Sequence, residues 1–112
     1  MKYFPAEPLA IIGAACRLPG DVSDLASLWN LLEKGVDAVS EVPPDRFSLD
    51  RYFSDAADLP GHSYTRAAGI LNGIKDFDAG FFGMPQKESL DMDPQQRLLL
   101  ELAFEALEHP GA

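Results

Sequence analysis

Met92-Asp-Pro-Gln-Gln-Arg-Leu-Leu-Leu-Glu101 predicts the best-defined element of this sequence, a helix. Asp93 can cap its N-terminus, and Pro94 fits the first helical position, where the N–H that proline lacks would have no partner. Gln96, three residues after the cap, completes the pattern of a capping box. From residue 98 to residue 107 nearly every position is apolar. We therefore expect a strongly apolar helix that begins at Pro94.

The polar positions of this helix form one narrow stripe. They are Arg97, Glu101, Glu105 and Glu108. A helix that is apolar around most of its circumference is buried on most sides. The rest of the chain predicts only two strands and one further good helix, which is too little to surround it. We expect much of this helix to pack against polypeptide outside the 112 residues, either the remainder of a larger domain or a partner.

The first half of the chain predicts a strand and a helix. Residues 9–13 form a short apolar run, whose length fits a strand covered on both faces, and the loop at residues 17–21 ends it. Ser23 or Asp24 can cap a following helix, and Gly35 fits a left-handed C-terminal cap. Apolar residues recur along that helix at the spacing of one face: Leu25, Leu28, Trp29 and Leu32.

The middle of the chain predicts mainly irregular structure. Residues 41–45 contain Pro43 and Pro44, which lack N–H groups and restrict their neighbours. Residues 50–60 are expected to form a surface loop, and residues 64–71 an extended segment. Phenylalanines gather nearby, at Phe77, Phe81 and Phe82. Core packing is the favoured interpretation of these rings, and a ligand-stacking surface is the alternative.

Composition and charge limit the classes of function. A chain of 112 residues with 46% hydrophobic and 24% charged residues is expected to form one small globular domain. The net charge of −9 argues against nucleic acid or an anionic membrane as a partner. No apolar run approaches the ~20 residues of a membrane span.

The single cysteine, Cys16, excludes an internal disulfide and favours a reducing compartment, the cytoplasm. Lys2, followed by the apolar residues 9–15 and Cys16, loosely resembles a lipoprotein signal. Pro5, Glu7 and Pro8 interrupt that pattern, so a buried strand is the favoured interpretation.

No set of residues predicts a catalytic, cofactor-binding or metal site. Nothing pairs Cys16 with His62 or His109, which a reactive thiolate or a zinc set would require. The sequence after Gly13 matches neither common nucleotide-loop pattern. Carboxylates are plentiful but are expected in loops or at helix caps: Asp45, Asp50, Asp55, Asp58, Asp76, Asp78, Asp91 and Asp93. We therefore assign no site residue.

A series of short blocks follows in order along the chain: Glu7-Pro-Leu-Ala-Ile-Ile-Gly13, Ala15-Cys-Arg-Leu-Pro-Gly20, Leu28-Trp-Asn-Leu-Leu32, Gly35, Asp37-Ala38, Glu41-Val-Pro-Pro-Asp-Arg46, Tyr64-Thr-Arg66, Gly69, Phe77-Asp-Ala79, Phe81-Phe-Gly83, Met92 to Glu101, and Glu105-Ala-Leu-Glu108. This ordered series resembles the opening of the ketosynthase (beta-ketoacyl synthase) domain of type I polyketide synthases. The sequence departs from the family pattern at Ala14, Ala67-Ala68, Met84-Pro-Gln-Lys87 and Pro110. None of these departures touches a catalytic motif.

The resemblance implies an α/β fold, the N-terminal part of a thiolase-like layered α/β/α/β/α fold built as a homodimer. Residues 1–6 would be a leader, and residues 7–112 the N-terminal portion of the ketosynthase domain. The family catalyses decarboxylative Claisen condensation of an acyl thioester with a malonyl-type unit on an acyl carrier protein, which carries the phosphopantetheine arm. Its nucleophilic cysteine and two catalytic histidines lie further downstream, and Cys16 matches a non-catalytic cysteine.

The resemblance therefore implies a scaffold, inactive and poorly folded alone, whose partners are the remainder of the ketosynthase domain and the acyl carrier protein. Two alternatives stay open. One is a naturally short, non-catalytic interaction module derived from a ketosynthase. The other is a thiol enzyme that uses Cys16.

Overall fold

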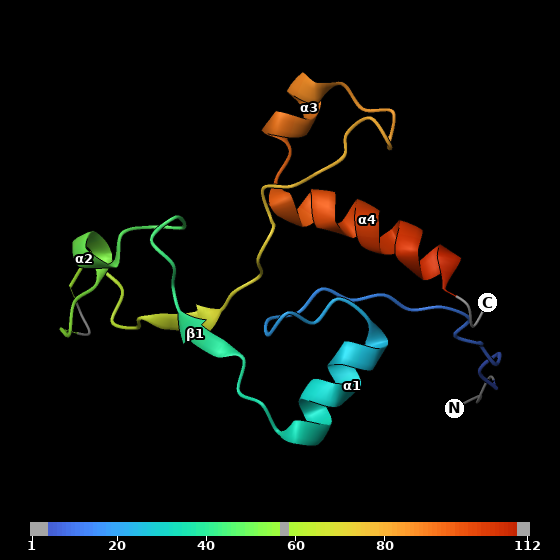
Figure 1. The fold of residues 1–112 in the computed structure, drawn as a ribbon, viewed down its shortest axis with the longest axis horizontal. Coiled ribbons are helices and arrows are strands. Elements are labelled where there is room, and N and C mark those ends of the chain that lie inside the picture. The colour runs from blue at the N-terminus through green and yellow to red at the C-terminus, as the bar shows by residue number, and fades with distance from the viewer. Residues whose placement is uncertain (1–4, 57–58, 110–112) are drawn as a thin grey trace. The chain divides into compact units, whose positions relative to one another are not determined.

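The computed structural model describes residues 5–56 and 59–109 (Figure 1). Its elements, in chain order, are α1 (Leu25–Lys34), β1 (Val39–Glu41), α2 (Leu49–Tyr52), β2 (Ala67–Gly69), α3 (Gln86–Asp91) and α4 (Pro94–Glu108). They fall into two compact units. One unit comprises residues 16–77, and the other combines residues 1–15 with residues 78–112.

Helix α1 begins and ends where the sequence predicts. The carboxylate of Asp24 accepts hydrogen bonds at 2.7 Å from both the N–H and the hydroxyl of Ser27, while the Asp24 N–H donates to the Ser27 hydroxyl at 3.1 Å. This is a capping box, which satisfies N–H groups that the first helical turn leaves unpaired. Gly35 ends the helix at φ 61°, a left-handed conformation that glycine adopts without steric cost.

The capping box makes a testable prediction about Asp24. The Ser27 hydroxyl, and then its backbone N–H, lower the pKa of Asp24 below its ordinary value. The cap therefore stabilises α1 fully above the unfolded-state pKa, and this stabilisation is lost as the pH falls through the lower folded-state pKa. We expect Ser27→Ala to return the pKa of Asp24 towards its ordinary value, as measured by carbon NMR of the carboxyl group during a pH titration.

Ser23→Ala is the matched control, because only the backbone N–H of Ser23 contacts the Ser27 hydroxyl. This variant should keep the low pKa of Asp24. An unchanged Asp24 pKa in Ser27→Ala would mean that the box does not set the titration of this carboxylate.

Strands β1 and β2 form a two-stranded antiparallel sheet with Val39 opposite Gly69 and Glu41 opposite Ala67. A further bond from the Val42 N–H to the Arg66 carbonyl, at 2.9 Å, extends the pairing by one step. Strand β2 confirms the extended segment predicted at residues 64–71. Strand β1 is too short to show an alternating pattern in the sequence. Its last residue, Glu41, lies in the stretch of residues 41–45 that was predicted to be irregular. The strand does end before Pro43 and Pro44.

Helix α2 corrects part of a prediction. The sequence indicated a surface loop at residues 50–60, but residues 49–52 form one helical turn. The turn is held by packing, since Leu49 is buried and Ser48 makes no capping bond with its side chain. Among the described residues, the buried apolar side chains are Val22, Val42 and Leu49, all within the unit of residues 16–77. The apolar core of the described chain is therefore small.

The predicted strand at residues 9–13 is wrong for this structure. No strand is assigned there, and Leu9 and Ile11 are 93% and 92% exposed. A strand needs a neighbouring strand to pair its backbone groups, and no described residue supplies one. The segment does approach α4 of the same unit: a Cβ added at Gly13 would lie 2.1 Å from the Ala106 carbonyl oxygen.

Helix α4 begins at Pro94 with Asp93 as its cap, as predicted, but the cap differs in detail. The Asp93 carboxylate accepts from the Gln95 N–H at 2.8 Å. The predicted capping box with Gln96 is absent among the described hydrogen bonds. Because α3 ends at Asp91, the chain has only one residue, Met92, in which to turn before this cap.

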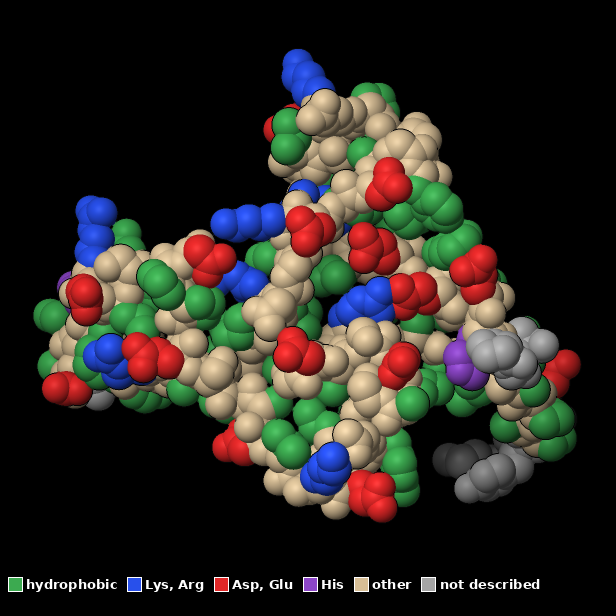
Figure 2. Space-filling view, in the orientation of Figure 1, with side chains coloured by type: hydrophobic (Ala, Val, Ile, Leu, Met, Phe, Trp, Pro, Cys, Tyr) green, Lys and Arg blue, Asp and Glu red, His purple; other side chains and the backbone are tan. Residues whose placement is uncertain are grey.

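Two leucines of α4 are largely uncovered. Leu99 is 68% exposed and Leu107 is 81% exposed, whereas Arg97 and Glu101 of the polar stripe are half-buried. Figure 2 shows hydrophobic side chains on the visible surface among the charged ones. This exposure agrees with the expectation that α4 packs against polypeptide outside the chain.

Aromatic rings contact α4 at Phe104. Phe81 packs edge-on against Phe82 at 5.0 Å and against Phe104 of α4 at 4.8 Å, between ring centroids. The core-packing interpretation is wrong for Phe81, which is 58% exposed despite these ring contacts, and Phe82 is only half-buried. Phe77 belongs to the other compact unit. Within the described ranges, no helix is long and apolar enough to cross a membrane.

Candidate functional site

The structure gives Cys16, His62 and His109 separate local contacts. Cys16 is half-buried with a free thiol. The ring nitrogen Nδ1 of His62 lies 3.0 Å from the Pro60 carbonyl oxygen, inside its own loop. His109 follows the last turn of α4, where its N–H donates to the Ala106 carbonyl. Within residues 5–56 and 59–109, no three His, Cys, Asp or Glu side chains form a group that could hold a metal ion.

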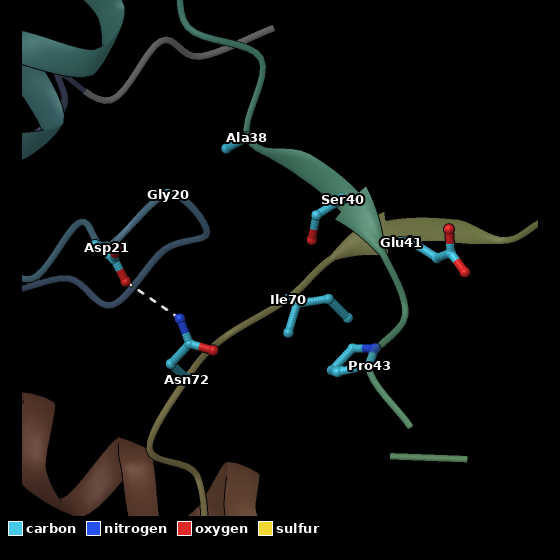
Figure 3. Close-up of a pocket in the computed structure, with 8 residues that line it drawn as sticks. All are labelled: Gly20, Asp21, Ala38, Ser40, Glu41, Pro43, Ile70 and Asn72. Atoms are coloured by element: carbon cyan, nitrogen blue, oxygen red, sulfur yellow. Dashed lines mark hydrogen bonds between the residues drawn. The ribbon is translucent and has the colours of Figure 1, made fainter. Parts of the chain in front are cut away.

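A hollow with a volume of about 290 Å³ lies beside the paired strands β1 and β2 (Figure 3). Its lining comes from three separate segments: Gly20, Asp21, Ala38, Ser40, Glu41, Pro43, Ile70 and Asn72. The antiparallel pairing of β1 with β2 brings two of these segments together, and the turn at Gly20 and Asp21 supplies the third.

One hydrogen bond fixes the acidic side of this hollow. The Asn72 side-chain amide donates to the Asp21 carboxylate at 3.2 Å, across 51 positions of sequence (Figure 3). Asp21 has φ 58°, a left-handed conformation that few residues other than glycine adopt but that aspartate tolerates. This bond and the neighbouring bridge between Leu18 and Val22 hold the turn in place.

The chemistry available in the hollow is hydrogen bonding and weak attraction for cations. The Glu41 carboxylate is paired with Arg66 at 3.1 Å, which leaves Asp21 as the main acidic group. The other polar side chains of the lining are the Ser40 hydroxyl and the Asn72 amide.

A second hollow, of about 280 Å³, shares Glu41 with the first. It is lined by Glu41, Val42, Pro44, Ser48, Leu49, Asp50 and Arg66. The guanidinium of Arg66 also lies 4.7 Å from the centre of the Phe53 ring. Such a cation–π contact, together with the ion pair to Glu41, gives Arg66 a structural role between β1 and the loop after α2.

Arg46 is the structurally important residue that the sequence reasoning left without a role. Its guanidinium donates to the Leu71 carbonyl, and its backbone N–H donates to the Pro43 carbonyl at 3.0 Å. Next to it, Asp45 lies 3.7 Å from the Lys75 ammonium. These contacts fasten the proline turn to the chain that leaves β2. The family block at residues 41–46 was the only signal in the sequence that pointed to Arg46.

The fold and sequence both match ketosynthases. The family model described as "Beta-ketoacyl synthase, N-terminal domain" matches residues 6–112. The chain belongs to the beta-ketoacyl synthase family and matches its N-terminal domain. The resemblance to a ketosynthase domain is thereby confirmed.

The curated relatives include proteins of polyketide synthases. One of them, from the phenolphthiocerol/phthiocerol polyketide synthase of Mycobacterium tuberculosis (strain CDC 1551 / Oshkosh), is 45% identical over 105 residues, which are 94% of this chain and 6% of that protein. The pikromycin polyketide synthase component PikAII of Streptomyces venezuelae is 50% identical over 106 residues, which are 94% of this chain and 3% of that protein. The chain thus spans a small part of the length of the relatives it matches.

The solved structures are ketosynthase domains. The oxazolomycin ketosynthase domain OzmH KS7 of Streptomyces albus JA3453 superimposes with a TM-score of 0.82 at 38% identity, covering 88% of this chain and 17% of that one. A ketosynthase from module 6 of the bacillaene synthase of Bacillus subtilis 168 gives a TM-score of 0.79 at 31% identity, covering 88% and 16%. These neighbours confirm the predicted α/β, thiolase-like fold class.

Proposed function

We propose that residues 7–112 are the N-terminal scaffold of a polyketide synthase ketosynthase, preceded by a leader at residues 1–6. The observation that carries this proposal is the family match over residues 6–112 combined with the exposed apolar side of α4. A helix whose leucines are uncovered within its own unit requires further protein to cover them. The remainder of a ketosynthase domain is the partner that fits both facts.

The activity we propose for the complete protein is decarboxylative Claisen condensation. A malonyl-type unit, held as a thioester on an acyl carrier protein, loses CO2 and becomes a carbanion. This carbanion attacks the acyl thioester on the active-site cysteine, and the cysteine leaves as a thiolate. Two histidines stabilise the negative charge that develops on the thioester oxygens. We assign the cysteine and both histidines to the downstream part of the domain and none of them to residues 1–112.

The partners and cofactor follow from this reaction. The phosphopantetheine arm belongs to the acyl carrier protein, so this chain is proposed to hold no cofactor itself. The complete domain is proposed to work as a homodimer in the cytoplasm, where the single thiol of Cys16 stays reduced. Residues 1–112 alone are proposed to be inactive and poorly folded, because so few apolar side chains are buried among the described residues.

The intact mass of the endogenous protein that contains this sequence is the first test. A mass far above the 12.2 kDa of these 112 residues, together with condensation of an acyl thioester and malonyl on an acyl carrier protein, is the expected result. A mass near 12.2 kDa would overturn the enzymatic proposal and favour a non-catalytic interaction module. A soluble, cooperatively melting monomer of residues 1–112 would contradict the scaffold role as well.

Cys16→Ser separates the proposed function from a thiol enzyme that uses this residue. In the complete polypeptide we expect condensation to continue at a rate within about twofold of the unmodified protein, since this half-buried thiol has no assigned role in the chemistry. Its effect on stability should stay within about 1 kcal/mol. An assay of malonyl condensation measures the activity, and a thermal melt measures the stability. Loss of activity with an unchanged melt would instead assign the nucleophile to Cys16.

A further inference from the structure

We draw no further inference here: the strongest candidate, the apolar stripe of Leu25, Trp29, Leu32 and Val36 along α1 and its C-terminal turn, is exposed but carries none, because nothing in the structure shows what covers it.

Discussion

Gly13→Ala is expected to destabilise the complete polypeptide strongly and to reduce its yield of folded protein. The added Cβ would lie 2.1 Å from the Ala106 carbonyl oxygen and 3.2 Å from the Cβ of His109. The first contact is with the backbone of α4, which cannot move aside without disturbing the helix, so residues 5–15 would have to shift away from it. Overpacking of this kind costs on the order of 3 kcal/mol. A thermal or urea melt of the purified protein measures the loss.

Gly80→Ala is the matched control for this substitution. The same methyl group added at Gly80 would meet its nearest atom, the Asp78 Oδ1, at 3.5 Å, an ordinary van der Waals distance. The control should change stability by less than about 1 kcal/mol, in either direction. Equal melts for Gly13→Ala and Gly80→Ala would mean that the N-terminal segment does not approach α4 in the protein.

Helix α1 shows how much of the fold local sequence can determine. Asp24, Ser27 and Gly35 act within a few residues of their partners, so the start and end of the helix can be read from the chain alone. The same holds for Asp93 and Pro94 at the start of α4. The role of Ser27 in the capping box was not predicted, because the usual pattern has a glutamate or glutamine at this position.

The elements that the sequence predicted wrongly depend on distant partners. Residues 9–13 have the composition of a buried strand, but strand formation needs a paired neighbour that the described chain does not contain. Helix α2 is a single turn fixed by the burial of Leu49, and β1 exists only because β2, nearly thirty residues later, pairs with it. Local patterns carry no signal for such contacts.

The hollow beside β1 and β2 could not be predicted either, because it too depends on contacts between residues far apart in the sequence. Its polar side depends on Asp21 and Asn72, which are 51 positions apart and share no motif.

Leu99→Glu tests whether the apolar side of α4 is covered in the complete protein. Leu99 is 68% exposed among the residues described, and a charge at an exposed helical position changes stability by only about 0.5 kcal/mol. If the rest of a ketosynthase domain covers this side, the same charge must be buried, which costs several kcal/mol without a partner. We expect the charge to be buried, and therefore a large fall in melting temperature and loss of condensation activity.

Two further variants make the interpretation of Leu99→Glu specific. Asn30→Glu introduces the same charge on an exposed position of α1, four residues before Lys34, where it should be neutral or slightly stabilising. Leu99→Met preserves the volume and apolar character of the side chain and should cost less than about 1.5 kcal/mol. Were Leu99→Glu to melt at the same temperature as Asn30→Glu, the apolar side of α4 would face solvent in the complete protein. The argument that α4 needs the remainder of a ketosynthase domain would then fail, while the assignment to the family, which rests on sequence, would stand.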